Sequence, residues 1–284
     1  MTESRLRTLV ALADTGSVRA AAERLYVTES AVSAAMTALA AELGVPLVRR
    51  RGRGIILTPA GQVYSGYARR ILGLHGEARA AARGEHDPGR GRLRIAAVTT
   101  AAEQVLPEVL AAFRGHWPEV ELTLEVGPSS RLWARLADHE ADLVLGGRPP
   151  DPGATVLARR PNELIVVLAP HLDFDLRTTP WVLREPGSGT RVLTAAYLAE
   201  HAAAPPELVL GSNGAVVAGA AAGLAAALVS RDAVRGDLAA GRLREVPAPG
   251  TPMPRPWHAV TGAAPTATTR LFGAELAAHG WSLG

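Results

Sequence analysis

The chain contains no cysteine, which excludes disulfide bonds and thiolate metal sites. It also contains no lysine, so all 30 of its basic residues are arginine. Aromatic residues make up only 4% of the chain, and no apolar run reaches the roughly 18 residues that a membrane-spanning helix needs. Charged side chains interrupt the apolar residues near the N-terminus, so we expect no signal peptide, no membrane partner and a cytoplasmic location.

Positive charge is concentrated in the first third of the chain. Residues 1–92 contain 14 arginines against 8 acidic residues, a net charge of +6, whereas residues 93–284 have a net charge of −3. A basic region attached to a mildly acidic one indicates that the basic region meets a polyanion. The chain also exceeds one typical domain of roughly 100–200 residues, so we expect two or three lobes.

Three short helices are predicted at the N-terminus. Residues 3–12 place apolar side chains on one face, and Gly16 stops this helix. Ser17 can cap a second helix, and Thr28 can cap a third that ends at Gly44. The inner face of the third helix consists of Val32, Met36, Leu39 and Leu43. Two helices joined by a short turn predict a helix-turn-helix.

A basic hairpin is predicted directly after these helices. Residues 45–48 and 55–57 are short β-like runs, and the sequence RRRGRG between them predicts a basic turn, so that the unit is a winged helix-turn-helix. The first turn of a recognition helix faces the major groove, and arginines in a wing pair with phosphates. The candidate DNA-binding residues are Thr28, Glu29, Ser30, Ser33, Arg49, Arg50, Arg51 and Arg53. Plain capping by Thr28, packing of Ser33 and a solvated arginine run remain the alternatives.

A long helix is predicted to follow, from Pro59 to Arg83, because Thr58 is a capping hydroxyl and proline suits the first helical position. Apolar residues recur along it at coiled-coil spacing, which predicts packing against a second copy of the chain. The candidate dimerisation residues are Val63, Tyr67, Ile71 and Leu74. The sequence GEHDPGRG at residues 84–91 predicts a hinge.

From residue 92 onward, predicted strands alternate with predicted helices, which indicates a doubly wound α/β sheet. One helix is predicted over residues 101–113. Ligands of such sheets lie beyond the carboxyl ends of the strands, where helix N-termini offer free N–H groups to an anionic or polar molecule. The candidate effector-binding residues are Thr99, Thr100, Ser129, Ser130, Ser188, Gly189, Thr190 and Asn213. Helix capping is the alternative for each. Arg191 could add a contact to the ligand or brace its own loop through Glu185.

Catalytic chemistry has little support in the sequence. Ser188 lacks the glycines two residues to either side that a nucleophile elbow requires, because Pro186 and Thr190 occupy those positions. The eight histidines form no cluster with metal-ligand spacing. We therefore expect no catalytic residues, no metal site, no cofactor and no enzymatic activity.

An ordered set of motifs resembles the LysR type of bacterial transcriptional regulator. Residues 6–61 resemble its winged helix through AA-x-x-L at 21–25, AVS at 31–33, LG at 43–44 and LTPAG at 57–61. Residues 92–284 resemble its sensor domain, which is similar to type 2 periplasmic binding proteins, through LPEVLAAFRGHWPEVEL, ADHEADLVLGG and REPGSGTR. The last of these also resembles family members that control carbon fixation and other central metabolism.

This resemblance implies an α+β multidomain protein in three parts. Residues 1–58 would form the DNA-binding domain and residues 59–87 the linker and dimerisation helix. Residues 88–284 would form a two-lobed effector-binding domain, with lobe one at about 92–161 and 257–284 and lobe two at about 162–256.

The implied function is promoter activation or repression under the control of a small polar or anionic metabolite. The partners would be a double-stranded DNA operator, the effector, and further copies of the chain in a homodimer or homotetramer. A free-standing solute-binding protein and an α/β enzyme that uses the same crevice are the alternatives. The sequence departs from the family's usual pattern at Glu29, Ala34 and Ala40, and the first two positions face the groove.

Overall fold

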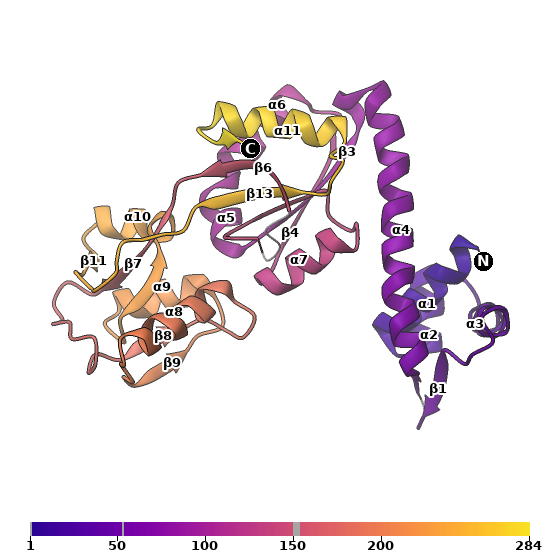
Figure 1. Ribbon diagram of the computed structural model, residues 1–284, viewed down its shortest axis with the longest axis horizontal. Coiled ribbons are helices and arrows are strands. Elements are labelled where there is room, and N and C mark those ends of the chain that lie inside the picture. The colour runs from indigo at the N-terminus through magenta and orange to yellow at the C-terminus, as the bar shows by residue number, and fades with distance from the viewer. Residues whose placement is uncertain (1, 53, 150–153) are drawn as a thin grey trace. The chain divides into compact units, whose positions relative to one another are not determined.

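The structure, a computed structural model, describes residues 2–52, 54–149 and 154–284. It divides into two compact units, one of residues 1–82 with 137–140 and one of residues 83–136 with 141–284. Among the described residues, no helix has the length and apolar character needed to cross a membrane. Figure 1 labels the elements of both units.

Three helices form the core of the first unit (Figure 1). They are α1 (Glu3–Thr15), α2 (Val18–Leu25) and α3 (Glu29–Leu43). The predicted caps are confirmed: Ser17 Oγ accepts a hydrogen bond from the backbone N–H of Ala20, and Thr28 Oγ1 accepts one from Ala31. Gly16 and Gly44 end α1 and α3 with positive φ angles of 63° and 72°, a conformation that glycine adopts without steric cost. The buried side chains include Leu6, Leu9, Leu12, Val32, Met36 and Leu39.

The wing differs from its prediction. Its strands are β1 (Val48–Arg51) and β2 (Gly54–Leu57), which pair antiparallel with Arg51 opposite Gly54. The first three arginines therefore lie in a strand and not in the turn. Gly52, at φ +59°, makes the chain reversal tight, so the strand extends further than the apolar residues alone suggest. Arg53 lies outside the described residues.

The helix α4 (Pro59–His86) starts from a close contact with the segment that precedes β1. Thr58 Oγ1 donates a hydrogen bond to the Pro46 carbonyl and accepts one from the backbone N–H of Gly61. A β-carbon at Gly61 would overlap the carbonyl of Leu47, so only glycine fits there. The helix extends three residues past the predicted end at Arg83 and stops within the hinge predicted at residues 84–91. A single glycine costs only about 1 kcal/mol in a helix and does not end it. The residue before Pro88 does end it, because proline disfavours helical geometry in the residue that precedes it.

The second unit contains a six-stranded mixed sheet in the order β14-β6-β13-β5-β3-β4. We call it the first lobe. Its strands are β3 (Arg92–Ala97), β4 (Glu121–Val126), β5 (Leu143–Gly146), β6 (Thr155–Arg160), β13 (Trp257–Thr261) and β14 (Ser282–Leu283). Only β3, β4 and β5 are parallel, because β13 returns from far along the chain and inserts antiparallel between β5 and β6. The expected purely wound sheet is therefore a mixed one.

The helices that cover this sheet are α5 (Thr99–Gln104), α6 (Leu106–His116), α7 (Ser129–Ala137) and α11 (Ala267–Ala278). The single helix predicted over residues 101–113 is wrong, since it is divided into α5 and α6 at Val105. Pro107 follows that break at the start of α6, where its missing N–H is tolerated. Phe113 and Phe272 meet edge to face in the core, with their ring centres 5.1 Å apart.

The second lobe comprises residues 163–254 and is built on smaller sheets. Its strands are β7 (Glu163–Leu168), β8 (Trp181–Leu183), β9 (Glu207–Val209), β10 (Ala227–Ser230), β11 (Arg244–Glu245) and β12 (Met253–Pro254). Its helices are α8 (Gly189–Glu200), α9 (Asn213–Ala221) and α10 (Arg231–Ala239). β7 is the central strand and pairs antiparallel with β10, β11 and β12, so this lobe too departs from an all-parallel sheet.

Candidate functional site

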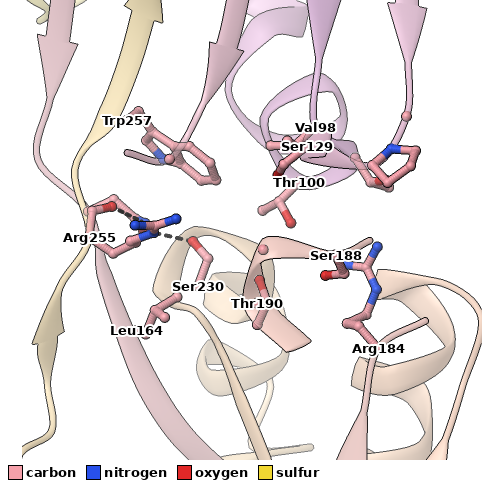
Figure 2. A pocket seen from close by; sticks show the side chains of 16 residues that line it. Val98, Thr100, Ser129, Leu164, Arg184, Ser188, Thr190, Ser230, Arg255 and Trp257 are labelled. Atoms are coloured by element: carbon pink, nitrogen blue, oxygen red, sulfur yellow. Dashed lines mark hydrogen bonds between the residues drawn. The ribbon is translucent and has the colours of Figure 1, made fainter. Parts of the chain in front are cut away.

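A pocket lies in the second unit where both lobes contribute strand ends and helix starts (Figure 2). Its volume is about 50 Å³, which excludes a large flat molecule. We call it the crevice pocket. It is lined by Val98, Thr99, Thr100, Gly127, Pro128, Ser129, Gly147, Asn162, Leu164, Arg184, Ser188, Gly189, Thr190, Ser230, Arg255 and Trp257. Six of the eight predicted effector-binding residues are therefore brought together.

The first lobe supplies Thr99, Thr100 and Ser129 because β3 and β4 are parallel and end at the same edge of the sheet. The loops after these strands are anchored to the sheet. The backbone N–H of Val98 donates to the Leu145 carbonyl at 3.0 Å, and that of Gly127 donates to the Ala97 carbonyl at 3.2 Å. The helices α5 and α7 begin directly after these loops, so their unpaired N–H groups lie at the pocket's edge.

The second lobe supplies Ser188, Gly189 and Thr190 at the start of α8. Ser188 is buried, and its Oγ accepts a hydrogen bond from the backbone N–H of Arg191. Gly187 precedes it at φ +87°, the left-handed conformation that favours glycine. A β-carbon at Gly189 would lie 3.2 Å from Ser129 Oγ. The two lobes therefore lie close together at Gly189, where the second one has no side chain.

Ser130 and Asn213, the other two predicted residues, do not line the pocket. A β-carbon at Gly187 would lie 3.3 Å from Ser130 Oγ, so Ser130 contacts the opposing loop. Asn213 is buried, and its Oδ1 accepts a hydrogen bond from Arg184 Nη1 at 3.2 Å. Asn213 therefore positions an arginine that itself lines the pocket.

Two arginines that the sequence interpretation missed reach the pocket from opposite sides (Figure 2). Arg184 is ion-paired: its Nε and Nη2 donate to the Glu185 carboxylate at 2.7 and 2.8 Å. Burial acts to raise the pKa of Glu185, but the hydrogen bonds from Arg184 and from its own backbone N–H outweigh burial, so the pKa lies below its ordinary value. Glu185 is thus ionised and neutralises most of the Arg184 charge.

Arg255 carries the uncompensated charge of the pocket. Among the described residues, no carboxylate lies within salt-bridge distance of its guanidinium. Burial lowers the pKa of Arg255 from its ordinary value, and the positive charge of Arg148 lowers it further. The guanidinium lies over Gly147, where a β-carbon would approach its Nη2 to 2.6 Å. A half-buried cation without an acidic partner is the local signal for an anionic ligand.

Arg191 has the second of its two predicted roles, although its partner is different. Its Nη1 donates to the backbone carbonyl of Arg184 at 2.7 Å, while Glu185 is taken by Arg184. Arg191 therefore braces the loop between β8 and α8. Among the residues that the structure describes, none of type Asp, Glu, His or Tyr lines the crevice pocket, and no group of three or more of them could hold a metal ion.

In the first unit, the predicted DNA-binding residues lie on the surface. Thr28, Glu29, Ser30 and Ser33 are all exposed at the start of α3, and Thr28 and Ser30 hydrogen-bond to each other at 2.9 Å between their hydroxyls. Arg49, Arg50 and Arg51 are exposed on β1. Within the described part of the chain, none of these three arginines is within salt-bridge distance of a carboxylate. Their charges are thus available to a partner.

The predicted dimerisation residues are apolar and exposed on α4. The exposed fractions are 64% for Val63, 58% for Tyr67, 40% for Ile71 and 53% for Leu74. Large apolar side chains aligned along one face of a helix favour a partner that covers them.

Comparisons with known proteins match both units. Residues 4–62 match the family "Bacterial regulatory helix-turn-helix protein, lysR family", and residues 86–281 match "LysR substrate binding domain". The transcriptional regulator CbbR of Rhodospirillum rubrum is 33% identical over 248 residues, covering 84% of this chain and 83% of the relative.

Solved structures share the fold. Full-length CbnR, solved with its target DNA, has 22% identity and a TM-score of 0.67, covering 98% of this chain and 99% of that one. The regulatory domain of Synechocystis CcmR, solved with 2-PG, has 24% identity and a TM-score of 0.59, covering 66% of this chain and 96% of that one. With both of its parts matched and its length spanned, this chain belongs to the LysR family of bacterial transcriptional regulators.

Proposed function

We propose that the crevice pocket binds the effector of this regulator, and that the effector is a small metabolite bearing phosphate or carboxylate groups. The observation that carries the proposal is Arg255, a half-buried guanidinium in a pocket edged by helix starts, with no acidic partner among the described residues. Free N–H groups at a helix start and the helix dipole both favour negative charge, and a guanidinium binds such oxygens in bidentate fashion. CcmR, a fold relative, binds 2-phosphoglycolate, which carries one phosphate and one carboxylate.

Two pocket variants test this proposal by calorimetry on the full chain. Ser188→Asp keeps an acceptor for the Arg191 N–H but adds negative charge, so it should abolish binding of an anionic effector. Gly147→Ala should push the flexible end of Arg255 aside and weaken binding by about tenfold. Gly115→Ala on α6, where an added β-carbon meets nothing within 4 Å, is the matched control. An effector that proves cationic or purely apolar, or one that binds all variants equally, would contradict the proposal.

We infer that binding in this pocket is not followed by catalysis. General acid–base catalysis needs a titratable side chain in contact with the ligand. The lining, as far as the chain is described, contains only hydroxyls, an amide, glycines, apolar side chains and arginines. The same residues suit reversible binding. Nuclear magnetic resonance of a bound effector over several hours should therefore detect no chemical change in it.

We propose that the first unit binds its operator through the start of α3 and the arginines of β1. CbnR, whose structure was solved with its target DNA, has the same fold. The exposed hydroxyls at the start of α3 and the unpaired cations of β1 supply the two kinds of contact needed, to base edges and to phosphates. The proposed site of action is the cytoplasm.

The regulator is proposed to act as a homodimer or homotetramer joined through α4. The apolar residues Val63, Tyr67, Ile71 and Leu74 would be covered by the same face of a second copy. Effector binding would then change the relative population of assemblies that hold the DNA-binding units differently. Such control requires the effector to bind those assemblies unequally.

A further inference from the structure

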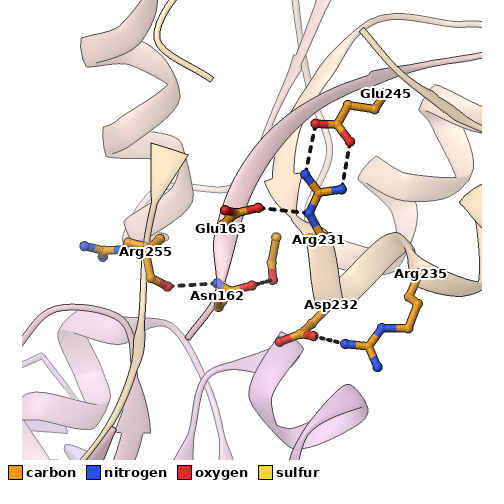
Figure 3. Close-up of polar contacts among 8 residues, drawn as sticks. Asn162, Glu163, Arg231, Asp232, Arg235, Glu245 and Arg255 are labelled. Atoms are coloured by element: carbon orange, nitrogen blue, oxygen red, sulfur yellow. Dashed lines mark hydrogen bonds and ion pairs between the residues drawn. The ribbon is translucent and has the colours of Figure 1, made fainter. Parts of the chain in front are cut away.

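Two chain segments connect the lobes of the second unit, and Asn162 fastens them together. The Asn162 carbonyl accepts a hydrogen bond from the backbone N–H of Arg255 at 2.8 Å, and Asn162 Nδ2 donates to the Arg255 carbonyl at 2.9 Å. Ser230 Oγ donates to Asn162 Oδ1 at 2.7 Å. Figure 3 shows Asn162 between Arg255 on one side and the group containing Arg231 and Asp232 on the other.

The two connecting segments, around Asn162 and Arg255, are extended. Successive side chains of an extended segment alternate in direction, so each segment presents side chains to two sides. Leu164, Arg255 and Trp257 line the crevice pocket. Their chain neighbours Glu163 and Pro256 line a second cavity of about 660 Å³, which Asn162 also lines. We call it the arginine cavity. Two separate cavities thus share the segments that join the lobes.

Four arginines from both lobes line the arginine cavity: Arg159, Arg160, Arg231 and Arg235. Only two carboxylates, Glu163 and Asp232, line it with them. Arg231 is fully engaged, by Glu163 at 3.1 Å and by Glu245 at 2.7 and 3.0 Å (Figure 3). The lining therefore has an excess of positive charge.

The remaining arginines of the cavity are less well compensated. Asp232 is shared between Arg235, at 2.7 Å, and Arg160, at 3.6 Å. Arg159 is exposed and lies within salt-bridge distance of no carboxylate in the described part of the chain. Arg159 and Arg160 belong to the first lobe and Arg235 to the second, so one ligand with two anionic groups can contact both lobes.

Trp257 links the two cavities. Its Nε1–H donates to Asp232 Oδ2 at 2.8 Å, while the residue also lines the crevice pocket. The Asp232 side chain is only 9% exposed and also pairs with Arg235 and Arg160. An anion that draws Arg235 and Arg160 away from Asp232 changes the surroundings of the carboxylate that accepts the hydrogen bond of the Trp257 indole.

We propose that the arginine cavity is a second binding site for a small metabolite with at least two phosphate or carboxylate groups, coupled to the crevice pocket through Asp232 and Trp257. None of the described residues that line the cavity is aromatic, so they offer a nucleobase no stacking surface. Three prolines, Asn162 and Ser282 form its remaining walls, which leaves charge as the main means of recognition. The site itself is independent of the proposed effector pocket; only the coupling rests on that proposal.

Titration calorimetry with pyrophosphate on the full chain tests the site. The Ser188→Asp variant blocks the crevice pocket and should retain pyrophosphate binding. Adding Arg159→Ser and Arg235→Ser, both at exposed positions, should weaken that binding at least about tenfold. Arg114→Ser, at an exposed position of α6, is the matched control and should change nothing.

Three outcomes overturn the second site: loss of all pyrophosphate binding in Ser188→Asp, unchanged binding after the two arginine substitutions, or no binding by the wild type. The first of these leaves the proposed effector pocket intact, because the anion then binds only there. Failure of the effector proposal looks different, since Ser188→Asp would then leave the binding of every ligand unchanged. The two proposals can therefore fail separately.

Tryptophan fluorescence tests the coupling without knowledge of the effector. Pyrophosphate added to the Ser188→Asp variant should change its tryptophan emission, because the anion alters the surroundings of Asp232, which accepts the hydrogen bond of the Trp257 N–H. The same titration on Ser188→Asp with Trp257→Phe should lose that change while calorimetry still detects binding. A fluorescence change that persists without Trp257 would overturn the coupling.

Discussion

Tyr197 illustrates how a single buried atom can limit stability. The side chain is 2% exposed in the core of the second lobe, and its hydroxyl has no hydrogen-bond partner among the described residues. Burial raises the pKa of Tyr197, and the charge of Glu200 raises it further. An unsatisfied buried hydroxyl costs about 1–3 kcal/mol, so removing it should help the fold.

We therefore expect Tyr197→Phe to increase the free energy of unfolding by about 1 kcal/mol. Urea denaturation followed by circular dichroism measures the change. Tyr26→Phe is the matched control, because Tyr26 is 96% exposed and its hydroxyl is solvated. A destabilised Tyr197→Phe would mean that the hydroxyl has a partner after all.

Glu29 is proposed to oppose DNA binding by its charge, while it favours its own helix. It lies exposed in the first turn of α3, where a carboxylate stabilises the helix dipole by about 0.3–1 kcal/mol. Glu29→Gln should therefore cost a few tenths of a kcal/mol in stability while strengthening operator binding by about 1 kcal/mol. Operator affinity of both proteins at one salt concentration checks this. Equal affinities would place residue 29 away from the interface.

At the scale of elements, strand alternation divides the arginines of β1. Arg49 and Arg51 point to one side of the hairpin and Arg50 to the other, because successive side chains of a strand alternate. The run of three adjacent arginines therefore cannot act as one patch. A DNA backbone that follows one side of the wing meets either Arg49 and Arg51 or Arg50 alone.

We expect the pair Arg49→Ala with Arg51→Ala, or Arg50→Ala, to weaken DNA binding, but not both to the same extent. Substitution on the side that contacts phosphates should reduce the slope of log affinity against log salt concentration by roughly one unit per lost contact. The reduction should be the same on specific and nonspecific DNA. Binding measured over a series of salt concentrations separates the two variants. An unaltered slope in both would exclude the wing from the interface.

The exposed apolar face of α4 predicts the effect of a charge at its centre. Ile71→Asp should place a carboxylate between two copies of the helix, which costs several kcal/mol without a partner. Sedimentation should then detect smaller species, and operator binding should be lost. Gln62→Asp adds the same charge at an exposed position outside this face and serves as control. Sedimentation like that of the wild type would mean that the chain associates through another surface.

At the scale of the whole molecule, His258 should make stability depend on pH. Burial lowers the pKa of His258 below its ordinary value, the charge of Arg159 lowers it further, and the carbonyls of Pro256 and Gly147 act in the opposite direction. As the pH falls, the unfolded chain takes up this proton first. The contribution of His258 to stability is thus complete above a pH of about 6.5 and is lost as the pH falls toward the pKa of the folded state.

His258→Gln should flatten this dependence. The measurement is urea denaturation at pH 7.5 and pH 5.5, and the quantity compared is the difference in unfolding free energy between the two conditions. His171→Gln, at an exposed position, should retain the wild-type difference. If the unfolding free energy of His258→Gln differs between the two pH values as much as that of the wild type, other groups cause the acid sensitivity.

The sequence by itself determined the elements whose signals are local. Ser17, Thr28, Gly16 and Gly44 fix the helices of the DNA-binding unit, because a cap or a helix stop acts within a few residues. The Leu-Thr-Pro-Ala-Gly motif fixes the start of α4 in the same way. Hydroxyl and glycine residues after strands likewise indicated six of the residues that line the crevice pocket, since the carboxyl ends of parallel strands meet at one edge.

Only the tertiary structure decided the charge within the crevice and the second cavity beside it. Arg255 lies 108 residues after Gly147, and nothing in local spacing brings the two together. Asn162 and Arg255 meet because β13 returns into the first sheet antiparallel, a pairing that periodicity does not encode. Asn213 was expected at the ligand but holds Arg184 in place. Its position at a helix start does not reveal which partner its side chain will bind. Pairing between distant segments is decided by how the strands pack together, and the crevice and the arginine cavity are products of that packing.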